Sequence, residues 1–393
     1  AKSVPSVGAW TAESGVICPI AAYPPQSDKP RVLISFYRAY LTAADLKPIE
    51  ALFDACRAKG CDVAAIFAPS LKTPDAAGWL RRQVRTLRPD AIVNATSFSG
   101  KGADGASPLD AADVPVFQVA LSTSRKKPWA EGDRGLSPAD LAMHVVLPEV
   151  DGRIFAGVAS FKEPGKKDPA LQFSHFGHRP HAEGIDAIVA RVLRWIALTP
   201  KSLQTAPKPA LILSTYPGKD WNMAHAVGLD ALASAEAILS DLQAPEGDPL
   251  QQGLTQSIGW DLEAYQTALR ALPQDLQDDL QRAWGAPETD PCVHNTQFHF
   301  RAVRRGHALV ALQPERGNVT SRDDDYHDLS RTPRHGYVAF YLWLRTQADV
   351  VVHIGAHGTL EWLPGKSVAL SQACWPQALI GDMPVIYPLS LIH

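Results

Sequence analysis

The chain contains 393 residues, of which 46% are hydrophobic and 20% charged, and its formal net charge is −3. This length is sufficient for two or three domains with separate cores, and the chain lacks the basic footprint of a dedicated nucleic-acid binder. No apolar run approaches the roughly 18 residues that a membrane helix needs, and the first residues do not read as a signal peptide. We therefore expect a globular protein that binds neither nucleic acid nor membrane.

The cysteines indicate a reducing compartment. Their number is odd and no pair has the CxxC spacing, so neither a disulfide framework nor a structural zinc site is expected, and a cytoplasmic location fits best. The chain begins at Ala1 and ends just after an apparent strand, so we expect it to be an internal piece of a longer polypeptide. The cysteines are Cys18, Cys56, Cys61, Cys292 and Cys374.

The first half of the chain predicts an α/β domain. Residues 1–29 contain several prolines and no clear period, so they are expected to form a linker or edge segment. Residues 30–200 then alternate between apolar strands and amphipathic helices, as is typical of a parallel doubly wound sheet. The predicted strands are Arg31–Tyr37, Cys61–Ala68, Ala91–Thr96, Val114–Leu121 and Arg153–Phe161, and the predicted helices are Ala43–Lys59, Asp75–Leu87, one that begins at Ser137, and Ile185–Leu198.

The second half predicts another domain of the same class. A joint with several prolines at residues 199–209 separates the halves, and the second domain is expected to span residues 208–393. The fold class is therefore α/β, with two doubly wound, mostly parallel sheets and a cleft between them. The predicted strands are Ala210–Thr215, Ala308–Gln313, Val350–Ile354 and Pro384–Tyr387, and the predicted helices are Ala231–Leu242, Leu262–Ala271, Gln274–Trp284 and Gly336–Thr346.

Polar and aromatic residues follow several of the predicted strands. In open α/β sheets the ligand crevice lies at the carboxyl ends of the strands, so these residues are candidates for binding. Turn residues also occur at strand ends without binding anything, so this pattern alone has modest weight. The positions include Arg38, Asn94, Lys162, Tyr216, Lys219, Arg316 and His353.

The most informative segment is HIGAHGTLEWLPGK at residues 353–366, which begins at the end of the strand Val350–Ile354. His353, His357 and Glu361 could ligate a divalent metal or form a general-base cluster. Gly355 and Gly358 oppose a helix, so the segment is predicted to be a turn from strand to loop. The alternative is a glycine-rich turn whose histidine is hydrogen-bonded to the backbone.

The sequence GKS at 365–367 does not complete a phosphate-binding loop. That motif needs a glycine at position 360, which is Leu360 here. We therefore expect no ATP to bind at this segment.

A second cluster lies at residues 333–344. Tyr337, Phe340, Tyr341 and Leu344 fall on one helical stripe, which is typical of a core-facing helix. His335 precedes this stripe and is less easily explained by packing, so it is a candidate for lining a site.

These segments resemble one family. Residues 353–365 are similar to HxGxHGTxEWLPG of the large subunits of cobaltochelatase (the CobN type) and magnesium chelatase, with every fixed position present. Residues 333–344 resemble the same family's PxHxYxAFYxWL element, which is preceded by an Asp-Tyr-His-Asp motif at 325–328. Residues 216–234 resemble its YPxxxG and GLDxxAS elements. The resemblance spans roughly residues 31–388.

The resemblance implies a tetrapyrrole-binding, metal-inserting subunit. Its substrates would be Co²⁺ and hydrogenobyrinic acid a,c-diamide, a corrinoid precursor in aerobic cobalamin synthesis. ATP and Mg²⁺ would be bound by AAA+ partner subunits of the CobS and CobT type. The resemblance implies Glu361 and His357 as catalytic residues and His353, His357 and Glu361 as metal ligands, and the proposed substrate-binding residues are His335, Trp362, Arg38, Lys219, Arg316 and Tyr216.

Cobalt is preferred over magnesium because residues 362–366 and 335–344 look more like the cobalt branch. Basic residues, among them Lys72 and Lys366, would suit the carboxylates of a corrinoid rim. Three alternatives stay open. They are a magnesium chelatase H-type subunit acting on protoporphyrin IX, a metal-dependent hydrolase that uses the same His/Glu cluster, and a non-catalytic scaffold that carries a tetrapyrrole.

Overall fold

The computed structural model describes residues 4–17, 28–199, 206–214, 229–317, 328–355 and 359–388. The chain divides into two compact units. Unit 1 contains Ala1–Ala197 and Lys366–Ala369, and unit 2 contains Leu198–Gly365 and Leu370–His393. Among the described residues, no helix is long and apolar enough to cross a membrane.

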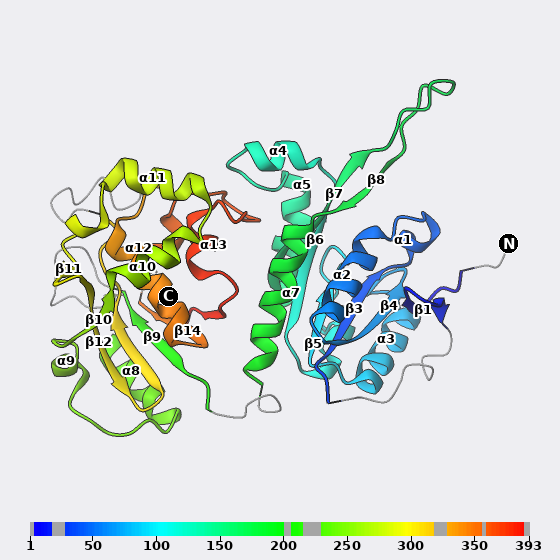
Figure 1. The fold of residues 1–393 in the computed structure, drawn as a ribbon. Helices are drawn as coiled ribbons and strands as arrows, with labels where there is room; N and C mark the ends of the chain where they lie inside the picture. The colour runs from blue at the N-terminus through cyan, green and yellow to red at the C-terminus, as the bar shows by residue number, and fades with distance from the viewer. Residues whose placement is uncertain are drawn as a thin grey trace. The chain divides into compact units, whose positions relative to one another are not determined.

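Unit 1 is built on an eight-stranded sheet with the order β2-β1-β4-β3-β5-β6-β7-β8 (Figure 1). Its five central strands, from β4 to β7, are parallel, and antiparallel strands close both edges. The strands are β1 (Gly8–Thr11), β2 (Gly15–Ile17), β3 (Arg31–Tyr37), β4 (Asp62–Ala68), β5 (Ala91–Asn94), β6 (Val116–Ser122), β7 (Ile154–Pro164) and β8 (Phe176–Pro180).

Helices cover both faces of this sheet, which explains why its central strands are almost continuously apolar. Helices α2 and α7 pack on one face, and α3 packs on the other. The helices are α1 (Arg38–Thr42), α2 (Lys47–Ala58), α3 (Pro74–Leu87), η2 (Pro108–Ala112), α4 (Lys126–Glu131), α5 (Pro138–Leu141), a π-helix η3 (Ala142–Val146), α6 (Leu147–Val150) and α7 (Ala182–Ala197).

Unit 2 has a second sheet, in the order β10-β12-β13-β9-β14-β15, with β11 paired to β12. Strands β13, β9, β14 and β15 are parallel, and β10, β11 and β12 add an antiparallel extension. The strands are β9 (Pro209–Leu213), β10 (Ser257–Asp261), β11 (Val293–His294), β12 (Gln297–Arg305), β13 (Ala308–Leu312), β14 (Val350–Ile354) and β15 (Val385–Ile386).

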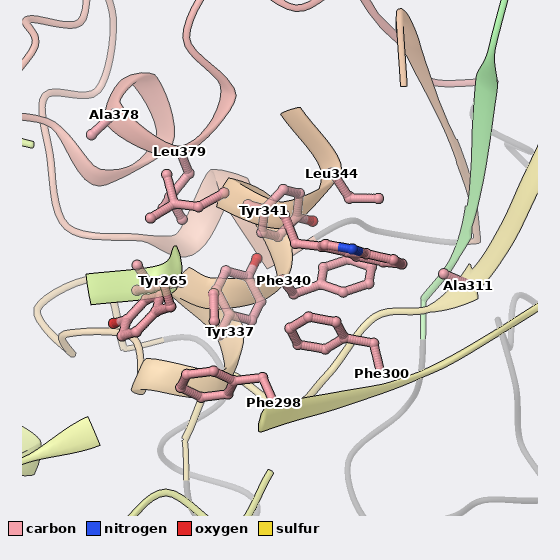
Figure 2. Packing of buried hydrophobic residues seen from close by; sticks show 14 of the residues in the cluster. Tyr265, Phe298, Phe300, Ala311, Tyr337, Phe340, Tyr341, Leu344, Ala378 and Leu379 are labelled. Atoms are coloured by element: carbon pink, nitrogen blue, oxygen red, sulfur yellow. The ribbon is translucent and has the colours of Figure 1, made fainter. Parts of the chain in front are cut away.

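The core of unit 2 is centred on α12 (His335–Gln347), which is buried on all sides from His335 to Leu344. Figure 2 shows aromatic rings from α10, β12 and α12 packed together in this core. The predicted stripe of Tyr337, Phe340, Tyr341 and Leu344 is therefore core, as expected. The other helices are α8 (Ala231–Asp241), α9 (Leu250–Gly253), α10 (Leu262–Arg270), α11 (Gln274–Trp284), η4 (Pro287–Thr289), η5 (Thr359–Trp362) and α13 (Trp375–Ile380).

The predicted fold class is confirmed: two mostly parallel sheets are flanked by helices. The antiparallel strand β12 was not predicted. Its side chains alternate between buried and partly exposed positions, because it has a helix-covered face and an outward face. Phe298, Phe300 and Ala302 carry this period of two, so the strand could have been recognised from the sequence.

Candidate functional site

The motif at residues 353–366 lies at the carboxyl end of β14, inside the parallel part of unit 2's sheet. Strand β14 lies between β9 and β15. The strand ends at Ile354 and is followed by Gly355 with φ of +153°, a value that favours glycine. Glu361 lies on η5, a short 3₁₀ helix beyond the strand. The strand thus ends within the motif, and residues 356–358, with His357 among them, lie outside the described residues, so the predicted turn stays a prediction.

His353 is buried in the core of unit 2 and is only 2% exposed. Its Nε2 lies 3.2 Å from the hydroxyl oxygen of Tyr341, and its ring stacks on the Tyr341 ring with centroids 6.2 Å apart. Burial lowers the pKa of His353 to about 4, so the imidazole is neutral near pH 7. Its Nδ1 has no hydrogen-bond partner among the described residues. A histidine that binds a cation typically does so through one ring nitrogen while the other ring nitrogen is hydrogen-bonded to the protein. The contacts of His353 are compatible with this arrangement.

A buried polar network holds this histidine in place. The Nε2 of Gln313 donates hydrogen bonds to Tyr337 and Tyr341, at 2.9 Å and 2.8 Å. Gln313 directly follows β13, and both tyrosines come from α12, so strand and helix fix the network together. Burial raises the pKa of Tyr341 well above its usual value, and the charges of Tyr337 and Glu361 add to this effect. Glu361 is therefore close enough to act electrostatically on the group that holds His353.

Ser214 adds a second unpaired polar atom on the same face of the sheet. Its backbone N–H bonds to the carbonyl of Ile354, directly after β9. His353 is in register with Ile212, and side chains two residues apart along a strand share a face. The Ser214 hydroxyl therefore lies on the His353 side, and it is buried without a hydrogen-bond partner among the described residues. Neither Gln313 nor Ser214 was singled out from the sequence, although each is polar and directly follows an apolar strand.

Glu361 is exposed at the surface, on a turn whose backbone is anchored. The guanidinium of Arg316 donates to the carbonyl of Trp362, and the N–H of Leu363 bonds to the carbonyl of Leu360 at 3.2 Å. Leu363 is buried in the core and anchors the turn there. The arrangement presents a carboxylate to solvent on a fixed backbone, beyond the end of the strand that carries His353.

Arg316 and Trp362 were both predicted to bind substrate. Arg316 is only 7% exposed, and its guanidinium is engaged by the backbone of Trp362. The carbonyl of Arg316 accepts a bond from the N–H of Arg334, at 3.0 Å. The Trp362 side chain is half-buried. Arg316 therefore supports the motif backbone, and a direct contact between either residue and a substrate stays a prediction.

His335 was predicted to line the site, and the structure places it in the core at the start of α12. It is 2% exposed. Its Nε2 lies 2.9 Å from the carbonyl of Gly285, and its Nδ1 lies 2.6 Å from the hydroxyl of Tyr265. Burial lowers the pKa of His335, so Nε2–H donates to Gly285 and Nδ1 accepts from Tyr265. Both nitrogens are engaged within the protein, which gives this residue a structural role.

The remaining predicted residues lie in unit 1 or outside the described residues. Arg38 belongs to unit 1, where its guanidinium donates to the carbonyls of Val4 and Pro5 at 2.7 Å and 2.8 Å. Tyr216 and Lys219 lie outside the described residues, as does the related His327. Among the described residues, no three His, Cys, Asp or Glu side chains are placed to hold a metal ion.

Unit 1 has a buried polar cluster of its own that the sequence did not reveal. Asp140 is fully buried and accepts hydrogen bonds from the hydroxyls of Ser122 and Thr123, at 2.8 Å and 2.9 Å. His144 lies on the π-helix with its Nε2 3.9 Å from Asp140, and its Nδ1 is buried without a partner among the described residues. Burial lowers the pKa of His144 despite the nearby carboxylate. A buried neutral histidine is thus held at the carboxyl end of β6.

Comparison with known proteins places the whole chain in one family. A family model described as CobN/Magnesium Chelatase matches residues 2–391. The aerobic cobaltochelatase subunit CobN of a Sinorhizobium species is 36% identical, over 92% of this chain and 30% of that protein. The corresponding protein of Pseudomonas aeruginosa is 34% identical, over 92% of this chain and 31% of its own length. The H-type subunit of magnesium chelatase from Cereibacter sphaeroides is 28% identical, over 92% of this chain and 33% of that protein.

A solved structure supports the same assignment. The catalytic subunit of cobaltochelatase from Mycobacterium tuberculosis matches with a TM-score of 0.78 and 28% identity, over 99% of this chain and 34% of that chain. The chain thus spans about a third of the length of the proteins it matches. Because the family model matches residues 2–391, the chain belongs to the CobN/magnesium chelatase family.

Proposed function

We propose that this chain is the part of a CobN-type cobaltochelatase subunit that holds the tetrapyrrole during insertion of Co²⁺. The substrate would be hydrogenobyrinic acid a,c-diamide, and AAA+ partner subunits of the CobS and CobT type would bind ATP and Mg²⁺. The identities favour cobalt over magnesium, because the two CobN subunits are 36% and 34% identical and the magnesium-chelatase subunits are 27% to 28% identical.

The observation that carries this proposal is that His353 lies at the carboxyl end of β14 and Glu361 lies on the anchored turn η5 that follows this strand. Metal insertion requires two pyrrole N–H protons to leave the macrocycle and the hydrated ion to lose water. Glu361 is exposed on an anchored turn and can accept a proton. His353 is kept neutral by burial, and its Nδ1 has no hydrogen-bond partner within the described part of the chain, so it offers a lone pair to a cation in the tautomer whose proton is on Nε2.

The surroundings of Glu361 and His353 differ and suit the two residues to different steps of metal insertion. Glu361 is exposed, whereas burial keeps the His353 imidazole uncharged. The carboxylate suits proton removal and transient attraction of Co²⁺, and the neutral imidazole suits coordination without a competing proton. The Tyr341 hydroxyl, 3.2 Å from Nε2, holds the ring in a fixed orientation.

The proposal is tested by an absorbance titration of hydrogenobyrinic acid a,c-diamide with the purified chain. Protoporphyrin IX is the control ligand, because a magnesium-chelatase subunit would bind it instead. We expect a saturable spectral shift with the corrinoid precursor and none with protoporphyrin. A shift with protoporphyrin alone would reassign the chain to the magnesium branch, and a shift with neither would contradict tetrapyrrole binding by this chain.

A further inference from the structure

Four residues that directly follow the motif, Lys366–Ala369, belong to unit 1, although the residues on both sides of them belong to unit 2. We call these four residues the strap. The strap starts five residues after Glu361 in the chain. The contacts that hold the strap therefore restrain a segment close in the chain to η5, the turn that carries Glu361.

Two hydrogen bonds fix the backbone of the strap. The N–H of Ser367 donates to the carbonyl of Asp133 at 2.8 Å, and the indole N–H of Trp129 donates to the carbonyl of Ala369 at 2.9 Å. Both partners lie on or just after α4. The bonds hold the start and the end of the strap, so its path is defined along its whole length.

Lys366 supplies a third anchor. Its ammonium donates to the carbonyls of Gly132 and Ala130, at 2.7 Å and 3.0 Å, and lies 5.3 Å from the centre of the Trp129 ring. Two carbonyl oxygens and an aromatic face satisfy a cation well. The sequence suggested Lys366 as a partner for substrate carboxylates, which stays a prediction, and in the structure its ammonium is held by these contacts.

The fit between strap and unit 1 is close. Ala369 is 4% exposed and packs in a cluster with Trp129, Leu136 and Phe161. Gly135 has φ of +84°, and a Cβ atom added there would lie 1.9 Å from the carbonyl oxygen of Val368. Backbone atoms cannot give way by that distance, so only glycine at position 135 allows the strap to dock.

We propose that Trp129, Gly135 and Lys366 are positioning residues for the reaction, because they dock the strap and thereby fix the Glu361 turn. Arg316 already holds this turn at Trp362. The docked strap restrains the chain on the other side of Pro364 and Gly365. The role in catalysis rests on the proposed function, whereas the docking itself does not.

Docking is tested by limited trypsin digestion of the full chain, because the bond after Lys366 is a trypsin site within the strap. The test variant is Gly135→Ala. The matched control is Gly152→Ala in the same unit, since Gly152 has a similar φ of +77° and no atom within 4 Å of an added Cβ. We expect cleavage after Lys366 to become at least about 10-fold faster in Gly135→Ala and to stay unchanged in Gly152→Ala. Equal rates in the two variants would overturn the docking.

Positioning is tested by hydrogen exchange of the η5 amides and by the kinetics of cobalt insertion. Lys366→Met should speed exchange at Thr359–Trp362, and Lys366→Arg should restore protection. With the ATPase partners present, Lys366→Met should reduce kcat about 100-fold and leave corrinoid affinity unchanged, as expected for a misplaced catalytic group. Faster cleavage of Gly135→Ala with unaltered η5 exchange in Lys366→Met would overturn the positioning role. If the wild-type protein does not insert cobalt, the proposed function is contradicted. The hydrogen-exchange rates of the η5 amides in Lys366→Met then decide whether the docked strap positions the Glu361 turn.

Discussion

Asp290 provides a sharp test of how the core beneath the motif is held together. Its carboxylate accepts hydrogen bonds from the Nη2 and Nε of Arg334, at 3.0 Å and 3.2 Å, and from the backbone N–H groups of Cys292 and Gly336, both at 2.9 Å. The Arg334 and Asp290 side chains are only 9% and 4% exposed. Four donors therefore converge on one buried carboxylate at the start of α12.

We predict that Asp290→Ala destabilises unit 2 by about 5 kcal/mol. Removing one partner of a buried ion pair costs about 3–5 kcal/mol, because the remaining charge is left uncompensated. The two backbone N–H groups also lose their acceptor, at about 1 kcal/mol each, so the total loss is at least about 5 kcal/mol. Asp290→Asn keeps an acceptor oxygen and should lose less.

Unfolding in urea is monitored by hydrogen exchange of a peptide from α12. This readout measures the unfolding of unit 2 separately from that of unit 1. Asp279→Ala is the control, because the Arg282–Asp279 pair is 74% and 43% exposed and should contribute about 0–1 kcal/mol. The reasoning is refuted if Asp290→Ala and Asp279→Ala unfold at the same urea concentration.

Three further predictions follow from other contacts. Burial lowers the pKa of His353 from 6.5 to about 4, so the unfolded chain binds a proton below pH 6.5 that the folded chain excludes. Stability should therefore fall by up to about 3 kcal/mol between pH 6.5 and 4, and His353→Phe should flatten this slope in urea unfolding; an unchanged slope would contradict the assignment. Arg316→Ala should speed hydrogen exchange at Thr359–Trp362, because Trp362 loses its donor, and full protection in the variant would count against the anchor. Iodoacetamide at pH 8 should leave Cys56 and Cys292 unmodified in the native chain, because burial raises the pKa of their thiols to about 12 and about 11; alkylation as fast as in urea, measured by mass spectrometry, would disprove this.

The parallel core could be predicted from the sequence because each of its strands is a local signal. β3 and β14, for example, are apolar runs with turn residues beyond them, and their predicted bounds, Arg31–Tyr37 and Val350–Ile354, are those of the structure. The π-helix η3 gave no such signal. It lies within a continuous helical stretch between α5 and α6, so the local pattern there is simply helical.

The site was predictable only where one segment carries it. His353 and Glu361 belong to a single motif, so their places at the end of β14 and just beyond it followed from the sequence. Gln313 lies 28 residues before Tyr341 in the chain, and Trp129 lies 240 residues before Ala369. Such pairings arise from tertiary packing, and no spacing rule within a segment could reveal them.

The burial of His335 illustrates the same limit. From the sequence it was a histidine placed just before an aromatic stripe and apparently available for a ligand. Its two partners, Tyr265 and Gly285, come from other segments of unit 2. The helical period identified Tyr337, Phe340, Tyr341 and Leu344 as core, but it could not show that α12 is buried on every side from its first residue, His335, to Leu344.

The most direct test of the central claim is a comparison of corrinoid binding and cobalt insertion in Glu361→Gln. Glutamine keeps the size and polarity of the side chain and removes the charge and the basicity. With the ATPase partners present, we predict that the variant binds hydrogenobyrinic acid a,c-diamide with unchanged affinity and inserts no cobalt. A Glu361→Gln variant that inserts cobalt at the wild-type rate would contradict the account.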